Sequence, residues 1–357
     1  MDMSERRAKT IRFMSPRECV LEEIDLAPEP LQGGQFLLET EYSVVSVGTE
    51  LANYAAIDPG VFQSGSWNEY PSTPGYGAVG RVLEVARGSE DRPGMPSTGQ
   101  RVFAFTPHAS LAVGDVEKHF VVPLDEDDDG SLLVLLRLAG VSMTAIRRAV
   151  SLQIGGIAVV VGLGAVGNFT AQLLQIAGLA VHAVERDPYR AKVARLAGIR
   201  AVVEADLIDA LRNDGRGDVA ELRGLADIVV EATGVSALAV AAATLARYGG
   251  QLVLLGTPRT PYPSDTTDFL RDVQLRGLTV TGASEWTLAI TGSHRQQGES
   301  WSIEEGYVAI RDLFRAGRLD GRDLISEIVP PSAAPEIYDA LLGAKRDLLG
   351  VVFDWRT

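Results

Sequence analysis

The stretch that decides the fold runs from Ile157 to Glu185 and reads IAVVVGLGAVGNFTAQLLQIAGLAVHAVE. Apolar, mostly β-branched residues from Ile157 to Val161 predict a buried parallel strand. A Gly-rich turn follows, and then an amphipathic pattern predicts a helix to about Ala177. A second apolar run, Ala180 to Val184, predicts another strand, which ends in Glu185.

The turn between the first strand and the helix has the spacing GxGxxG, made by Gly162, Leu163, Gly164, Ala165, Val166 and Gly167. In this pattern Gly162 allows the tight turn, Gly164 lets main-chain N–H groups approach a pyrophosphate, and Gly167 lets the helix pack on the strand. The helix N-terminus offers partial positive charge to the phosphates, and Glu185 can accept hydrogen bonds from an adenosine ribose. The stretch therefore predicts a dinucleotide site.

The rest of the chain divides into two kinds of pattern. Short alternating runs between Gly/Pro turns predict a β-rich barrel or sandwich up to about residue 130, and a helix is expected from Ser131 to Val150. Strands and helices then alternate to about residue 300, which predicts a doubly wound parallel sheet. Ligands bind such sheets at the strand carboxyl ends, so Thr233, Gly234, Gly256 and Thr257 should lie beside the Gly-rich turn. The final run, Gly350 to Trp355, should return to the N-terminal sheet.

Composition narrows the function classes. The 357 residues are 46% hydrophobic and carry a net charge of −14, which argues against nucleic acid or an anionic membrane as the main partner. The single cysteine, Cys19, excludes an internal disulfide and a zinc site built from cysteines. No run of about 18 uncharged apolar residues and no signal-peptide pattern is present, so a soluble, cytoplasmic protein is expected. The acidic run Asp125 to Asp129 is expected to be a solvated loop.

Three further motifs make the chain resemble the medium-chain dehydrogenase/reductase family over essentially its whole length. They are Val47-Gly48-Thr49-Glu50 (family pattern CGTD), Pro74-Gly75-Tyr76-Gly77 (PGHE) and Gly99-Gln100-Arg101-Val102 (GDRV). The resemblance implies an α/β protein with a GroES-like β-rich catalytic domain, residues 1–140 and 301–357, and a Rossmann domain, residues 141–300. It also implies a homodimer formed by edge-to-edge pairing of late sheet strands.

The zinc-ligand positions of this family are occupied by other residues. The Cys of CGTD is Val47, the His of PGHE is Tyr76, and the third position is Gly140. Catalytic zinc needs three N, S or O ligands from the protein, so we expect no metal. The chain looks most similar to a zinc-lacking subgroup that includes bacteriochlorophyllide-type and sugar or cyclitol dehydrogenases.

Without zinc, a side chain must handle the substrate proton. The resemblance places Thr49 at the proton-relay hydroxyl, although the relay histidine is Ala52 here. Tyr76 could donate from its phenol or merely fill the empty zinc position. Glu50 could orient its neighbours or form a structural ion pair, and His108 could carry the proton or be a solvated loop residue.

The cofactor is expected to be NAD, because Glu185 would repel a 2′-phosphate, although the adjacent Arg186 leaves NADP possible. By resemblance, Arg190 lies near the adenosine ribose, and Thr144, Ser284 and Glu285 lie near the nicotinamide. The expected function is zinc-independent hydride transfer between NAD and a secondary alcohol or ketone of a polyol, cyclitol, sugar or similar small metabolite. Two alternatives are an NADPH-dependent quinone or enoyl reductase and a non-catalytic NAD-binding sensor.

Overall fold

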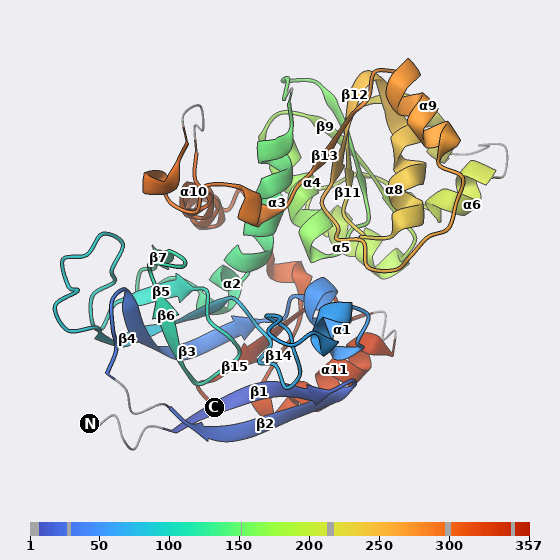
Figure 1. Cartoon of the computed structure of the whole chain (residues 1–357). Coiled ribbons are helices and arrows are strands. Elements are labelled where there is room, and N and C mark those ends of the chain that lie inside the picture. The colour runs from blue at the N-terminus through green and yellow to red at the C-terminus, as the bar shows by residue number, and fades with distance from the viewer. Residues whose placement is uncertain (1–6, 27–29, 151, 213–217, 297–300, 344–346) are drawn as a thin grey trace. The chain divides into compact units, whose positions relative to one another are not determined.

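The computed structural model describes the chain except for residues 1–6, 27–29, 151, 213–217, 297–300 and 344–346 (Figure 1). It folds as two compact units. Unit 1 comprises Met1–Arg137, Ala289–Arg315 and Ile325–Thr357, and unit 2 comprises Leu138–Leu288 and Ala316–Leu324. The mixed α/β fold with a β-rich unit and a Rossmann-type unit is the predicted one.

The observed unit boundaries differ from the predicted ones, 140/141 and 300/301. The segment that begins at Ala289 was predicted to lie in the Rossmann domain as far as residue 300 and groups with unit 1, and Ala316–Leu324 was predicted to lie in the catalytic domain and groups with unit 2. The reason for the second difference is a two-way contact with helix α4 (Ala165–Ile176). The Gln172 side chain donates to the Asp320 carbonyl at 2.8 Å and accepts from the Asp320 N–H at 2.9 Å.

Unit 2 contains a six-stranded, all-parallel sheet in the order β10-β9-β8-β11-β12-β13. Its strands are β8 (Ile157–Val161), β9 (Ala180–Glu185), β10 (Ala201–Glu204), β11 (Ala226–Glu231), β12 (Ala246–Leu254) and β13 (Thr279–Gly282). Numbered from β8, the order is 3-2-1-4-5-6, so the chain direction across the sheet reverses between β8 and β11. Dinucleotides bind at this switch point in doubly wound folds.

Helices cover both faces of this sheet (Figure 1). On one face Ala158 and Val160 of β8 pack with residues of α3, α4 and α5, and on the other Val159 and Val161 pack with α6, α7 and α8. This alternation explains the continuous apolar run at β8, because a strand covered on both faces has no polar side. The helices of the unit are α3 (Leu136–Arg148, from Leu138 onward), α4, α5 (Pro188–Leu196), α6 (Leu207–Arg212), α7 (Asp218–Glu221), α8 (Ser236–Ala242) and α9 (Thr267–Leu275).

Unit 1 is built on a seven-stranded sheet in the order β14-β15-β3-β4-β5-β7, with β6 also paired to β3, and on a separate hairpin, β1–β2. Its elements are β1 (Arg7–Ser15), β2 (Glu18–Asp25), β3 (Gln35–Val44), α1 (Val47–Tyr54), β4 (Ala78–Val85), β5 (Arg101–Ala104), β6 (Leu111–Asp115), β7 (Val121–Pro123), α2 (Gly130–Leu133), α10 (Ile303–Arg315), β14 (Ile325–Val329), α11 (Ala334–Leu342) and β15 (Gly350–Asp354). The C-terminal strand β15 pairs with β3, as predicted.

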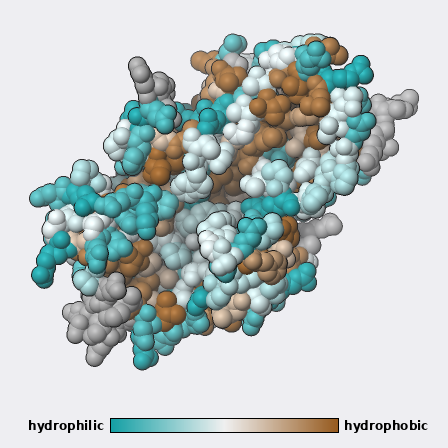
Figure 2. All heavy atoms as spheres, viewed as in Figure 1, coloured by the Kyte–Doolittle hydropathy of each residue, from teal (hydrophilic) through white to brown (hydrophobic). Residues whose placement is uncertain are grey.

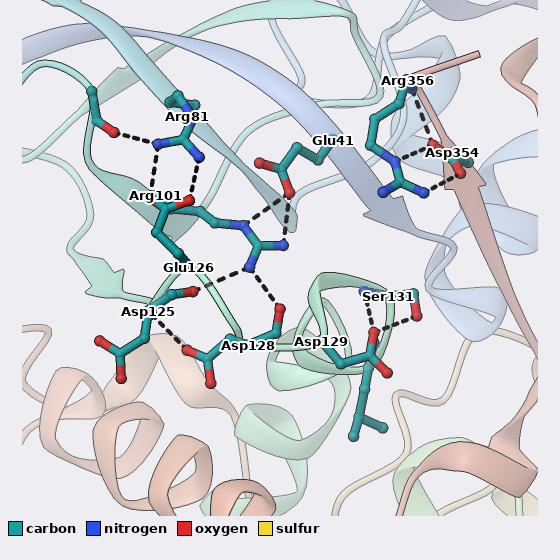
Figure 3. A network of polar contacts seen from close by, with 12 residues as sticks. Glu41, Arg81, Arg101, Asp125, Glu126, Asp128, Asp129, Ser131, Asp354 and Arg356 are labelled. Carbon is teal, nitrogen blue, oxygen red and sulfur yellow. Dashed lines mark hydrogen bonds and ion pairs between the residues drawn. The ribbon is translucent and has the colours of Figure 1, made fainter.

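One local expectation is wrong and another is incomplete. The single helix predicted from Ser131 to Val150 is divided into α2 and α3, because Leu135 and Arg137 donate to carbonyls three residues earlier and tighten the chain between them. The acidic run is an exposed loop as expected, except that Asp128 is half-buried and the loop is held by two arginines (Figure 3). Arg101 binds Glu41 and donates to the carbonyls of Asp125 and Asp128, and Arg315 binds the Asp128 carboxylate at 3.0 Å.

These contacts also lower the pKa of one carboxyl group in the loop. Burial alone would raise the pKa of Asp128, but the bonds from Arg315 and the Asp125 N–H outweigh burial and lower that pKa below its ordinary value. The run is therefore an anchored loop of unit 1.

Candidate functional site

The Gly-rich turn of unit 2 has the close approaches that the sequence predicts. A Cβ added to Gly167 would lie 1.9 Å from the Gly162 carbonyl oxygen, so helix α4 packs on the turn only with glycine there. Gly162 has φ +89° and would place a Cβ 2.4 Å from the Thr233 methyl. The position of a Gly164 Cβ is open, which leaves the main chain there accessible to a ligand.

Glu185 lies at the same turn, as the fingerprint requires. Its side chain is buried at 5% exposure, and its carboxylate accepts from the N–H groups of Leu163 at 2.7 Å and Asp187 at 2.8 Å. A carboxylate has about four acceptor positions, so two remain for ribose hydroxyls. Arg186 is exposed and lies 3.8 Å from Asp206, and Arg190 is half-buried in α5.

Sequence reasoning missed one residue of this edge, Glu231 at the end of β11. Its side chain is fully buried and accepts from the Thr233 N–H at 2.7 Å, the Thr233 hydroxyl and the Gly234 N–H at 3.2 Å. Burial raises the pKa of Glu231, while these hydrogen bonds act in the opposite direction. The available signal was an acidic residue that ends an apolar strand immediately before Ala-Thr-Gly.

Glu231 holds the Thr233-Gly234 turn, which contacts the residues that follow β12. A Cβ on Gly256 would lie 2.0 Å from the Gly234 nitrogen, and a Cβ on Gly234 would lie 2.6 Å from the Thr257 carbonyl oxygen. Gly162, Thr233, Gly234, Gly256 and Thr257 therefore converge at the carboxyl ends of β8, β11 and β12. Of the other predicted cofactor residues, Thr144 is buried in α3, and Ser284 and the buried Glu285 follow β13.

Unit 1 brings together the four predicted catalytic residues. Thr49 and Glu50 lie in the first turn of α1, Tyr76 follows the Pro74-Gly75 turn, and His108 follows β5. Gly75 makes this convergence possible, because it has φ +89° and a Cβ there would lie 2.6 Å from the His108 ring and main chain. The His108 N–H also bonds the Pro74 carbonyl at 2.9 Å.

His108 is fully buried, with both ring nitrogens bonded. Nε2 lies 3.1 Å from Glu50, and Nδ1 lies 2.7 Å from the hydroxyl of Ser43. Trp355 donates to that hydroxyl at 2.8 Å, so a neutral His108 with its proton on Nε2 satisfies the whole series of groups. The solvated loop histidine considered from the sequence is therefore wrong. The proton-carrying role stays a prediction, and the ring exposes neither nitrogen.

Glu50 is the centre of this buried network. One carboxylate oxygen accepts from the Ser46 N–H at 2.7 Å, and the other accepts from His108 and from the Tyr338 hydroxyl. Burial and the Glu50 charge raise the pKa of Tyr338, which stays a neutral donor. Both predicted readings of Glu50, an orienting carboxylate and a structural partner, are compatible with these contacts.

Tyr76 and Thr49 lie on the less buried side of the network. The half-buried Tyr76 shares a hydrogen bond with the Ser46 hydroxyl, and its ring centroid lies 4.7 Å from the guanidinium carbon of Arg137. Thr49 is half-buried, and its N–H bonds the Ser46 carbonyl at 3.1 Å. Ser46, Ser43, Tyr338 and Trp355 were not predicted from the sequence.

Comparison with known proteins supports the fold and the resemblance to dehydrogenases. Residues 165–292 match the model of the zinc-binding dehydrogenase family. The chain is 26% identical to the 2-desacetyl-2-hydroxyethyl bacteriochlorophyllide A dehydrogenase of Cereibacter sphaeroides, over 98% of this chain and 99% of the relative. Both comparisons agree with the resemblance to dehydrogenases found in the sequence.

Solved structures support the same fold for this chain. A Sinorhizobium meliloti 1021 protein described as a zinc-binding dehydrogenase bound to NADP matches with a TM-score of 0.76 and 18% identity, over 98% of this chain and 100% of that chain. Galactitol-1-phosphate dehydrogenase from Escherichia coli matches with a TM-score of 0.76 and 16% identity, over 97% and 99% of the two chains.

The three positions at which the resemblance predicts zinc ligands carry side chains in this chain that do not fit zinc. Val47 and Gly140 have no ligating atom, and the Tyr76 hydroxyl is bonded to Ser46. Among the described residues no group of three or more His, Cys, Asp or Glu side chains could hold a metal ion. In the same part of the chain, no helix has the length and apolar character needed to cross a membrane.

Proposed function

We propose that this chain is a zinc-independent dehydrogenase that transfers hydride between NAD and a secondary alcohol or ketone of a polyol, cyclitol, sugar or similar hydroxylated metabolite. The observation that carries the cofactor assignment is the Glu185 carboxylate bonded to the Gly-rich turn at the switch point of the sheet. The names of the related proteins, all of them dehydrogenases, support the reaction type.

Unit 2 would hold the cofactor. Main-chain N–H groups at the start of α4 would bind the pyrophosphate, and Glu185 would bind the adenosine ribose. Negative charge at Glu185 favours NAD over NADP, while Arg186 and Arg190 would lie near the adenosine end. Thr144, Ser284 and Glu285 would support the nicotinamide.

Unit 1 would handle the substrate proton. The bound nicotinamide would accept or supply the hydride. Tyr76 and Thr49 have hydroxyls on the half-buried side of the network and would exchange a proton with the substrate oxygen. Glu50 and His108 are buried behind them and would act as positioning residues.

The test is a screen of secondary alcohols, using galactitol, sorbitol, myo-inositol and 2,3-butanediol with NAD and following NADH formation. We expect turnover of at least one alcohol, insensitivity to a zinc chelator, and loss of turnover in Tyr76→Phe with NADH binding unchanged. NADPH-dependent reduction of an enone or quinone, or NADH binding without turnover of any of these compounds, would contradict the proposal.

A further inference from the structure

The hydroxyls of Ser46 and Tyr76 form a pair in unit 1. Ser46 precedes helix α1 as its N-cap residue, and a serine in that place usually accepts a hydrogen bond from the first turn of the helix. Here its side chain makes no capping bond and instead shares a hydrogen bond with the phenol of Tyr76. The Ser46 side chain is therefore bonded to Tyr76 and does not cap its helix.

Counting hydrogens shows what the pair can still do. Each hydroxyl has one hydrogen and can accept as well as donate. The Tyr76 phenol donates its hydrogen to the Ser46 hydroxyl. Neither hydroxyl bonds any other described residue, so the Ser46 hydrogen stays available to an acceptor oxygen, and the Tyr76 hydrogen can then pass to Ser46.

The pair is held in place from its buried side. The Ser46 N–H donates to Glu50 at 2.7 Å, and the opposite oxygen of Glu50 is fixed by His108 and Tyr338. The Tyr76 ring lies against Arg137, a cation–π contact that fixes its plane. Ser46 is 8% exposed and Tyr76 is half-buried, so water reaches the pair from the phenol.

We infer that Ser46 and Tyr76 act as one proton-transfer unit, with Glu50 and His108 as positioning residues for Ser46. This inference rests on the proposed dehydrogenase function. In ketone reduction, the carbonyl carbon gains a hydride from the reduced cofactor and the carbonyl oxygen gains the available hydrogen of the pair as a proton. Water at the Tyr76 phenol then returns a proton to the pair. Alcohol oxidation follows the reverse path, with the proton released to water.

The first test measures hydrogen bonding by the two hydroxyls in a complex that does not react. Isobutyramide, whose carbonyl oxygen accepts a hydrogen bond but is not reduced, is titrated into the full-length protein saturated with NADH. Ser46→Ala and Tyr76→Phe should each weaken isobutyramide binding about 3- to 10-fold, the effect of one hydrogen bond. Tyr70→Phe and Ser66→Ala are matched controls in unit 1, because their hydroxyls bond Asn53 and Asn68 instead, and both should bind as the wild type does.

The second test measures turnover of the best alcohol from the screen. Each single variant should lower kcat by about 100-fold or more at unchanged NADH affinity. The double variant should be no slower than the slower single variant, because groups that act as a unit are not additive. Glu50→Gln, which keeps an acceptor for the Ser46 N–H, should retain more activity than Glu50→Ala when melting temperatures are compared alongside.

The outcomes separate this inference from the proposed function. Three results would contradict the inference that Ser46 and Tyr76 act as one unit. They are turnover with NAD that Ser46→Ala leaves unchanged, additive losses of activity in the double variant, and no isobutyramide binding to the wild type. If isobutyramide binding depends on both hydroxyls but no alcohol is turned over, the result would support joint action of Ser46 and Tyr76 and contradict the dehydrogenase assignment.

Discussion

The main-chain N–H of Leu163 donates a hydrogen bond to the carboxylate of Glu185 across 2.7 Å. This contact joins the Gly-rich turn after β8 to the end of β9. Because Asp187 binds the other carboxylate oxygen at 2.8 Å, the protein alone fixes the orientation of the acidic group. The turn proposed to bind the pyrophosphate and the carboxylate proposed to bind the ribose are thus joined by a direct hydrogen bond.

Replacing Glu185 with alanine should weaken NADH binding about 10- to 100-fold, since a hydrogen bond to a charged group contributes roughly 1.5–3 kcal/mol. NADPH binding should fall less, because the change also removes repulsion of the 2′-phosphate. Fluorescence titration measures both affinities. Glu204→Ala is the matched control, because Glu204 lies opposite Glu185 in the β9–β10 register and pairs with Arg195. An equal loss in the control would argue against a specific role of Glu185.

The two glycines of the turn should respond differently to alanine. Gly167→Ala should destabilise unit 2 by roughly 2–4 kcal/mol, because its Cβ would meet the Gly162 carbonyl at 1.9 Å. Gly164→Ala should keep a melting temperature near that of the wild type, since its Cβ meets open space, but should weaken NADH binding. Thermal unfolding of both variants tests this contrast, and equal melting temperatures would refute it.

Glu231 should make stability fall as pH rises. Burial raises its folded pKa above the ordinary value of 4.5, so the folded protein binds this proton more tightly than the unfolded chain does. The linked stability is fully present below pH 4.5 and is lost as pH rises through the folded pKa. Urea unfolding at a series of pH values from below 4.5 upward should show the free energy of unfolding of the wild type falling relative to that of Glu231→Gln. A pH-independent difference between the two proteins would be the contrary result.

Strand β13 ends the sheet of unit 2, and among the described residues it pairs only with β12. An exposed strand edge favours pairing with another chain. Unit 2 has an apolar patch on the face shown in Figure 2, and Leu270 and Leu275 of α9 and Val280 of β13 are exposed. We predict a homodimer that Val280→Lys converts to monomer in sedimentation analysis. Val113→Lys changes an exposed valine of unit 1 and should leave the dimer intact. A monomeric wild type would contradict this prediction.

The convergence of residues at the strand ends of unit 2 was predictable because its signals are local. The apolar run before Gly162, the helical period after it and the acid at Glu185 all lie within one βαβ unit, whose geometry follows from strand and helix periods. Glu231 was accessible by the same reasoning, since a charge at the end of a buried strand requires partners. The β1–β2 hairpin was not among the predicted strands, although β1 begins with alternating exposed and buried residues.

The buried network of unit 1 was not predictable, because its partners are distant in sequence. Glu50 meets Tyr338 and His108, and Ser43 meets Trp355, through the folding of β15 and α11 onto the N-terminal sheet. No periodicity encodes such pairs. Ser46 was hidden for a different reason: a serine before a helix predicts a cap, and only the fold shows that Tyr76 takes its hydroxyl.

The most direct measurement is calorimetric titration of NADH and NADPH into purified protein whose zinc content has been quantified. The proposed function predicts that NADH binds at least about 10-fold more tightly than NADPH, from the repulsion of a 2′-phosphate by Glu185, in protein without bound zinc. Tighter binding of NADPH, or stoichiometric zinc retained through purification, would contradict a zinc-independent, NAD-dependent dehydrogenase.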